Sequence, residues 1–444
     1  MDAAPQHYDV IIVGAGMVGA TLACALAGAP GTANLRIAVL EAQALPDGTA
    51  SAGHDIDDID LRVSAITHAS QRIFTAVGAW AGMAARRMGA FREMHVWEEG
   101  DPTPGLTRHP TSYNAEIHFD SADIGENTLG HIIENRVIQG ALLDRLRSFN
   151  NITLLCPARV ASVTITSATA QVGLDDGRQL TATLVVGADG AHSKVRQMAG
   201  ITTWGWSYGQ KGVVATVKTG LSHRETAWQR FLPRGPLAFL PLNDGRCSIV
   251  WSTTLEHADA LMAMDEPLFL AALEQAFGDK LGNMIAITPS HGSIAPSRAA
   301  FPLHLQHASA YTAPRLALIG DAAHTLHPLA GQGVNLGVLD AATLAEVILD
   351  AYNSDNDIGA HRVLRRYERW RKSDNLAMLA IMDGFKRLFS NDFPPLRWLR
   401  TRGLRLTHHL PPVKNLIMRQ AMGLTGDLPK LARRNSGTLG AGQT

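Results

Sequence analysis

A glycine and an acid, Gly320 and Asp321, directly follow an apolar run at residues 316–319 that is typical of a buried strand. A loop rich in proline and glycine comes next, and from Asn335 an apolar-periodic pattern predicts a helix over 336–347. A carboxylate at a strand end beside a helix amino end suits a polar cofactor, because the first helical turn presents unpaired N–H groups and a partial positive charge. Alone, the stretch is equally consistent with a connection in which the glycines only turn the chain.

A second glycine-rich corner lies near the N terminus, where an apolar run leads into Gly14, Gly16 and Gly19. A helical run follows, and the next strand ends in Glu41, 22 residues after Gly19. This order is the context that a dinucleotide fingerprint requires: the glycines allow a tight turn, a close pyrophosphate and close helix packing, and the acid binds ribose hydroxyls. The acid also argues against a 2′-phosphate. The motif therefore predicts FAD or NAD, rather than NADP, as the resident nucleotide.

A third corner repeats the pattern, with an apolar run at 184–186 followed by Gly187, Asp189 and a helix that carries Lys194 and Arg196. The pattern is suited to phosphates or to the ribose of the resident dinucleotide. There is one complete dinucleotide fingerprint and no CxxC, so one resident FAD with a transient NAD(P)H fits better than a disulfide reductase.

The segments between these corners differ in character. Residues 151–186 have the pattern of a β-meander, and residues 61–77 are predicted to form a helix in which Arg62 faces either a phosphate or solvent. A helix is also expected within 129–146, with Arg136 near its start. Residues 212–254 are β-rich, with a hairpin turn at Asn243-Asp244-Gly245, and indicate an antiparallel sheet of a second domain. Its aromatic residues are candidates for a cavity wall or, more often, for core: Trp228, Phe231, Phe239 and Trp251.

Bulk properties fit a globular chain of more than one domain. There are 444 residues, 46% of them hydrophobic, and only three cysteines, which have no metal-like spacing, so we expect a reduced compartment and no metal. No apolar run is long enough to span a membrane, and the N terminus does not resemble a signal peptide. Residues 361–444 hold 17 Lys+Arg and 5 Asp+Glu, a balance of +12, whereas the rest of the chain carries −12. The basic tail is either a solvated helical face or a surface for an anionic partner.

The three corners together resemble the group A flavoprotein monooxygenases, the class typified by para-hydroxybenzoate hydroxylase. Several stretches are similar to the FAD-dependent hydroxylases of ubiquinone biosynthesis, and within that family the resemblance is nearest to the branch that oxygenates ring position 5 of 2-octaprenylphenol. The stretches that carry this resemblance are residues 61–66, 129–135, 187–196, 237–242, 247–252, 320–337 and 419–424.

The resemblance implies an α/β fold with a Rossmann-like FAD-binding domain, an inserted antiparallel β-sheet substrate domain and a C-terminal helical tail. The expected division is 1–90, 125–200 and 295–350 for the FAD-binding domain, 91–124 and 201–294 for the substrate domain, and 351–444 for the helical region.

The resemblance also implies roles for individual residues. The N-terminal glycines and Glu41 hold the ADP half of FAD, Asp321 binds the ribityl chain, and Asp189 with Arg196 lies between FAD and the docking nicotinamide donor. Residues 331–335 lie against the N1–C2 edge of the flavin. The implied cofactor-binding set is Gly14, Gly16, Gly19, Glu41, Arg62, Arg136, Asp189, Gly320, Asp321, Gly331, Gln332, Gly333, Val334 and Asn335.

The implied reaction is ring hydroxylation of a polyprenylphenol with NAD(P)H and O2 by way of a flavin C4a-hydroperoxide. Pro328 is expected near the ring, and His131 and His324 are weak candidates for a base. Alternatives are a hydroxylase of a small aromatic acid, a prenyl-lipid reductase and a non-catalytic flavoprotein scaffold. We expect a cytoplasmic protein with a hydrophobic substrate, membrane contact or a biosynthetic complex through the basic tail, possible self-association and no nucleic acid.

Overall fold

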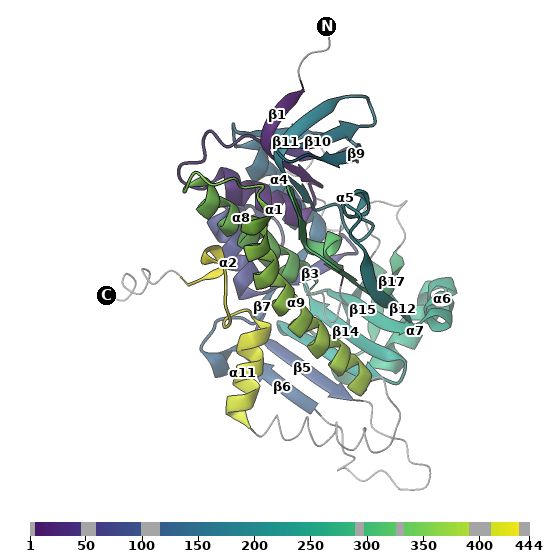
Figure 1. Ribbon diagram of the computed structural model, residues 1–444. Helices are drawn as coiled ribbons and strands as arrows, with labels where there is room; N and C mark the ends of the chain where they lie inside the picture. Colours follow the sequence, from purple (N-terminus) through teal and green to yellow (C-terminus); the bar gives the residue numbers. More distant parts are fainter. Residues whose placement is uncertain are drawn as a thin grey trace.

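The structure is a computed structural model that describes residues 5–45, 59–98, 116–288, 297–325, 333–389 and 410–434. Figure 1 shows two sheets at opposite ends of an elongated molecule, with helices packed along one side.

The first sheet has a parallel centre built from the strands that precede the three glycine corners. Its order is β18 (Thr312–Ala313), β19 (Leu316–Leu318), β11 (Gln179–Gly187), β1 (Gln6–Val13), β2 (Ile37–Leu40) and β8 (Ile152–Leu155). The meander strands β9 (Val160–Ile165) and β10 (Ala170–Leu174) extend it from β11. The predicted strands at 8–13, 184–186 and 316–319 are therefore confirmed as neighbours, and their apolar runs are buried because helices cover the sheet.

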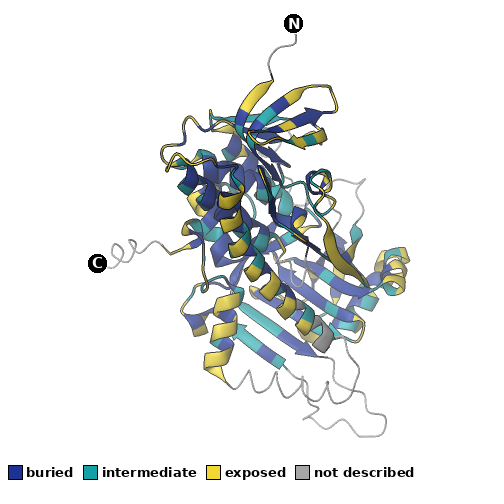
Figure 2. Ribbon diagram, in the orientation of Figure 1, coloured by how far each residue is buried: buried dark blue, intermediate teal, exposed yellow. Residues whose placement is uncertain are grey.

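Helix α1 (Met17–Ala27) packs against α8 (Gly333–Tyr352) and α4 (Asn135–Arg147), and all three contribute to the core of this sheet. Figure 2 shows α1 and α8 as mostly buried. Close packing at the α1–α8 crossing depends on Gly337, because a Cβ there would lie 2.6 Å from Cγ2 of Val18.

The second sheet has nine strands and is mostly antiparallel. Its order is β20 (His324–Thr325), β17 (Arg298–Ala308), β12 (Thr203–Thr219), β15 (Cys247–Thr254), β14 (Gly235–Pro241), β13 (Thr226–Leu232), β5 (Glu93–Glu98) and β6 (Glu116–Asp120), with β16 (Met284–Thr288) paired to β12. The hairpin turn predicted at 243–245 joins β14 to β15, and Gly245 has φ +86°. Phe239 and Trp251 belong to the core of this sheet under helices α6 (Leu255–Ala263) and α7 (Glu266–Phe277). Strand β17 lies in this sheet, although the expected division placed residues 295–350 in the FAD-binding part, because β17 pairs along β12.

A small third sheet corrects the helix predicted to begin at Leu61. Residues Val63–Ile66 form strand β3, which pairs with β7 (Gly130–Glu134), and β4 (Gly89–Phe91) completes the sheet. The helix α2 (His68–Ala76) begins only after Thr67, whose side chain accepts a hydrogen bond from the Ser70 N–H. The remaining short elements are α3 (Trp80–Ala84), α5 (Lys194–Met198), and 3₁₀ turns at Ser121–Ile124, Asp279–Leu281, Gly320–Ala322 and Lys430–Ala432.

The basic C-terminal region forms helices, as predicted. Helix α9 (His361–Phe389) runs diagonally from beside α8 toward the second sheet, and α11 (Pro411–Ala421) lies beside β5 and β6 (Figure 1). The predicted basic stretch at 396–406 lies outside the described residues.

Candidate active site

The three glycine-and-acid corners meet at one edge of the first sheet. In the register of the parallel strands, Val13 stands beside Gly187, and Gly187 beside Leu318. The alignment continues past the strands, because Ala188 donates its N–H to Val13 O at 2.8 Å and Ile319 donates to Gly187 O at 3.0 Å. Neighbouring strands are about 4.8 Å apart, so the three corners span roughly 10 Å.

The N-terminal glycines form a tight loop in which Gly14 and Gly19 have no room for a side chain. Gly14 has φ +109°, and a Cβ on it would lie 2.4 Å from Ala188 O, so the Gly14 corner is in contact with the Gly187–Asp189 corner. A Cβ on Gly19 would lie 2.0 Å from Gly14 O. A Cβ on Gly16 would meet nothing within 4 Å, so this glycine faces open space at the start of α1. The helix has no side-chain cap there, which leaves its first N–H groups available for an anion.

Glu41 follows the end of the strand beside β1 and lies next to the same glycine loop. One of its carboxylate oxygens accepts the Ala15 N–H at 2.9 Å, and the other accepts the Gln43 N–H at 3.0 Å. From the opposite side, the Gln139 side chain donates to Ala15 O at 3.4 Å. The acid thus lies next to the glycine loop, where the fingerprint requires it.

One carboxylate oxygen of Asp189 accepts hydrogen bonds, and the other has no hydrogen-bond partner among the described residues. Its Oδ2 accepts the N–H groups of Lys194 and Val195, which caps α5, whereas Oδ1 is buried and has no hydrogen bond. A buried carboxylate oxygen without a donor is costly, so a hydroxyl-bearing ligand at this edge would satisfy it. The buried Arg196 donates to Ala191 O at 2.8 Å and to Ala322 O at 2.7 Å, which ties the Asp189 corner to the Asp321 corner.

Asp321 lies in the 3₁₀ turn Gly320–Ala322 that follows β19. Its side chain is exposed, yet desolvation by the surrounding protein raises the pKa of its carboxyl, while the charges of His324 and Arg62 act to lower it. Arg62 is exposed at the same place, with its guanidinium 5.6 Å from the centre of the Phe301 ring.

The buried carboxylate of Asp340 supports the Gly320–Asp321 corner. Asp340, on α8, accepts the Gly320 N–H at 3.1 Å and contacts His324 Nε2 at 2.5 Å through the same oxygen. Its other oxygen accepts from Arg371 Nε at 2.9 Å and from Asn375 at 3.2 Å. Burial alone would raise the pKa of Asp340, but His324 and Arg371 lower it, so the carboxylate is ionised. This cluster links α9 to the glycine corner, and sequence reasoning missed it. The available signal was an acid within the apolar-periodic stretch of 336–347.

The start of α8 faces the corners, but only part of the expected segment is described. Gly333 is exposed, Val334 is half-buried, and Asn335 is buried, where it donates to Ala65 O at 2.8 Å and accepts from the Thr67 N–H at 3.1 Å. The predicted residues Pro328, Gly331 and Gln332 lie outside the described residues.

The remaining candidates contact other protein groups, although Nδ1 of His131 is buried without a hydrogen-bond partner among the described residues. Arg136 donates from Nε to the buried Glu134 at 3.0 Å. His131 packs edge-on against Trp80, and burial, with the charge of His68, lowers its pKa to about 4. His324 is committed to Asp340 and is buried. The geometry favours structural roles for both histidines over the role of a base.

A parallel sheet with three glycine-and-acid corners, joined to a large antiparallel sheet, defines an FAD-binding monooxygenase fold of the para-hydroxybenzoate hydroxylase type. A profile of the FAD binding domain matches residues 61–379. The chain superposes on p-nitrophenol 4-monooxygenase PnpA from Pseudomonas putida with a TM-score of 0.68, over 94% of this chain and 98% of that one, at 18% identity.

Sequence comparison narrows the assignment. The chain is 38% identical to the ubiquinone hydroxylase UbiL of Rhodospirillum rubrum over 97% of its own length and 94% of the relative. It is 37% identical to the human mitochondrial ubiquinone biosynthesis monooxygenase COQ6 over 93% and 92%. The protein therefore belongs to the FAD-dependent monooxygenase family of ubiquinone biosynthesis.

Proposed function

We propose that this protein hydroxylates the aromatic ring of a polyprenylphenol intermediate of ubiquinone biosynthesis, using FAD bound across the three corners. The observation that carries the proposal is the alignment of the Gly14, Asp189 and Asp321 corners at one sheet edge. The substrate class comes from the relatives, which are named for ubiquinone hydroxylation and ubiquinone biosynthesis.

The residues present fit FAD. Open space at Gly16 and the uncapped start of α1 accept a pyrophosphate, and Glu41 accepts ribose hydroxyls. The free oxygen of Asp189 and the exposed carboxylate of Asp321 are acceptors for the hydroxyl groups of the chain that joins pyrophosphate to flavin. Bound FAD supplies electron transfer from NAD(P)H and the activation of O2. The amino end of a helix stabilises negative charge, and this is the role we assign to the start of α8.

The test combines a genetic and an isotopic measurement. Deleting the gene should cause a prenylated precursor that lacks one ring hydroxyl to accumulate, and mass spectrometry identifies it. The purified protein with NAD(P)H, 18O2 and that precursor should give a product that carries one 18O atom. Unlabelled product, or NAD(P)H oxidation that the precursor does not change, would contradict the proposal.

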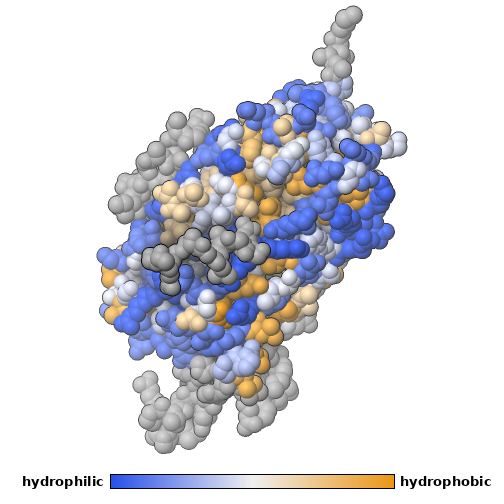
Figure 3. Space-filling view, turned by 90° about the vertical axis from the view of Figure 1, so that its left-hand side faces the viewer, coloured by the Kyte–Doolittle hydropathy of each residue, from blue (hydrophilic) through white to orange (hydrophobic). Residues whose placement is uncertain are grey.

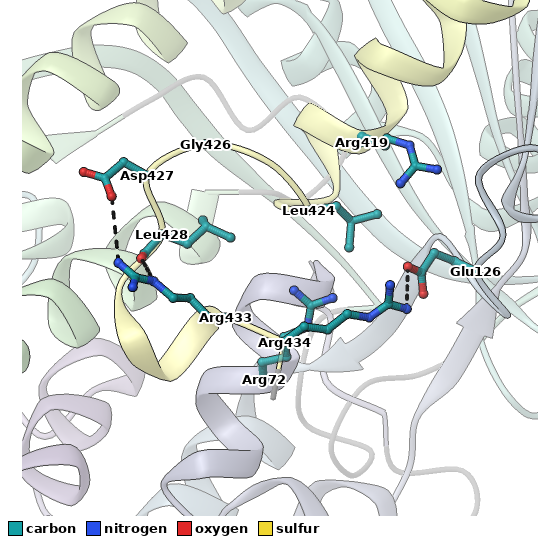
Figure 4. A pocket seen from close by; sticks show the side chains of 9 residues that line it. All are labelled: Arg72, Glu126, Arg419, Leu424, Gly426, Asp427, Leu428, Arg433 and Arg434. Carbon is teal, nitrogen blue, oxygen red and sulfur yellow. Dashed lines mark hydrogen bonds and ion pairs between the residues drawn. The ribbon is translucent and has the colours of Figure 1, made fainter. Parts of the chain in front are cut away.

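We also propose that the basic C-terminal region contacts an anionic membrane surface, where a polyprenyl substrate resides. Helix α11 exposes Val413, Leu416 and Ile417, with Leu416 63% accessible. Nearby, a recess of about 300 Å³ is lined by four arginines, three of them from the C-terminal region, and by Glu126 and Asp427. Figure 4 shows these side chains around the recess: Arg72, Arg419, Arg433 and Arg434. Exposed apolar residues beside a surplus of arginine suit a surface of anionic lipid.

No described helix is long and apolar enough to cross a membrane. Apolar patches also lie along the middle of the face in Figure 3, between hydrophilic ends. Flotation with vesicles that contain phosphatidylglycerol tests the contact: Leu416→Glu should abolish binding, whereas Leu268→Glu, at a leucine 59% accessible on α7, should not. Equal binding by both variants would refute this docking surface.

A further inference from the structure

Two histidines and two glutamates meet on one face of the β5–β6 hairpin, remote from the flavin corners. His95 and His118 stand directly opposite each other in the antiparallel register, with ring centroids 4.1 Å apart. Glu93 lies two residues before His95 and therefore on the same face of β5. Both strands lie at the end of the molecule opposite β1 (Figure 1). The cluster therefore contains none of the proposed flavin-binding residues.

We propose that Glu93, His95 and His118 form a binding site for a divalent transition-metal ion, and that Zn²⁺ fits it best. One carboxylate oxygen of Glu93 lies 2.9 Å from His118 Nε2 and 3.7 Å from His95 Nε2. One ligand atom from each of the three residues lies within 4.8 Å of the others. A tetrahedral zinc ion with ligands at about 2.0–2.1 Å has ligand–ligand edges of about 3.3–3.4 Å, so the two Glu93 distances bracket the required value. Shifts of roughly 0.4 Å would bring both Glu93 edges to this value, and a rotation of the two imidazoles, whose rings are stacked at 28°, would turn both Nε2 atoms toward one ion.

Surrounding residues already orient the first of these imidazoles. The Nδ1 of His95 lies 3.0 Å from Glu116, which leaves Nε2 facing Glu93 and His118. A carboxylate bound to the second nitrogen of a zinc-binding histidine is the usual supporting arrangement, because it fixes the tautomer and the ring. Trp228 stacks on His95 with centroids 4.7 Å apart, and Lys280 lies 3.8 Å from Glu116. Glu116 is thus a positioning residue for the site.

The site has three protein ligands, all half-buried, so a fourth position remains for water. Its two histidines lie on β5 and β6, which residues 99–115 separate along the chain. A bound ion would therefore hold these two strands together at the edge of the second sheet. The sequence did not indicate a metal because one ligand pair is formed across strands rather than by a short spacing along the chain.

The test is calorimetric titration of the tag-free, FAD-loaded protein with ZnCl2, with metal content measured by plasma mass spectrometry. We expect one ion per chain and a higher melting temperature. His118→Ala and Glu93→Gln should each weaken binding at least ~100-fold, and Glu116→Gln should weaken it ~10–100-fold, the usual effect of losing a supporting partner. His7→Ala, which removes an exposed histidine elsewhere, is the matched control and should bind normally.

Glu93→Gln keeps the size of the side chain and guards against a folding defect, and an unchanged flavin spectrum and metal-free melting temperature confirm that it is folded. One ion that is lost in folded Glu93→Gln and retained in His7→Ala supports the site. No stoichiometric zinc in the wild type, or equal zinc in the wild type and the Glu93 and His118 variants, overturns it.

Discussion

Replacing Asp340 with asparagine should unfold or severely weaken the corner that carries Asp321. The carboxylate is fully buried and accepts from four groups, among them the Gly320 N–H and the Arg371 guanidinium. Asparagine offers one acceptor oxygen instead of two. If that oxygen serves Arg371, the buried Gly320 N–H loses its acceptor, and Arg371 loses its buried counter-ion, although it keeps an ion pair with the exposed Asp374.

Breaking a buried ion pair by removing one partner costs about 3–5 kcal/mol. For a cooperative unit of about 150–250 residues this corresponds to a fall of roughly 6–20 °C in melting temperature. The pKa of Asp340 is lowered in the folded protein, so the ionised group stabilises the fold at neutral pH. That contribution is lost as the pH falls below the unfolded value of about 3.9 and through the lower folded pKa. Asp340→Asn should lack this part of the acid sensitivity.

The assay is thermal unfolding of the FAD-free protein by circular dichroism, together with FAD affinity by fluorescence quenching. Asp350→Asn is the matched control, because Asp350 lies on the same helix in half-exposed ion pairs with Arg366 and Lys430 and should cost less than about 1 kcal/mol. Adding Arg371→Met to Asp340→Asn removes the buried charge that has lost its Asp340 partner and should cost less than the sum of the single changes. A loss below 1 kcal/mol in Asp340→Asn, or strict additivity in the double variant, would refute the reasoning.

Three further predictions concern the corners themselves. Gly16→Val should leave the melting temperature of the FAD-free protein unchanged and abolish FAD binding, since its Cβ points into open space; destabilisation without FAD would contradict this. Gly19→Ala should prevent folding, because its Cβ would lie 2.0 Å from Gly14 O, and a soluble, normally stable variant would show that the packing is different. The pKa of Asp321 is raised, so its ionised form is disfavoured in the FAD-free fold at pH 7; Asp321→Asn should therefore maintain or raise stability without FAD while weakening FAD binding, as calorimetry and flavin fluorescence would measure. Lower stability with unchanged FAD affinity would reverse both assignments.

The corners could be predicted from the sequence because their chemistry is local. A strand end, a glycine and an acid occupy a few consecutive residues, as at Gly187–Asp189 and Gly320–Asp321, and parallel strands bring their carboxyl ends to one edge. The hairpin turn at 243–245 was equally local.

Contacts between residues that are far apart along the chain could not be predicted from the sequence. Asp340 meets Arg371 from a different helix, 31 residues away, and no periodicity reports such a contact. The error at 61–66 has a similar cause: the apolar spacing fits a helix, but pairing with β7 and the Thr67 cap make it a strand followed by a helix. Likewise, the cluster on β5 and β6 exists only through the cross-strand register.

The central claim is that the three corners bind one FAD, and a crystal structure of the protein purified with its flavin tests it most directly. The account predicts continuous density for one FAD along the sheet edge, with the adenosine ribose at Glu41, the pyrophosphate at Gly16 and the ribityl chain at Asp321. Density for FAD at any other surface, or a sheet edge that excludes it, would contradict the account.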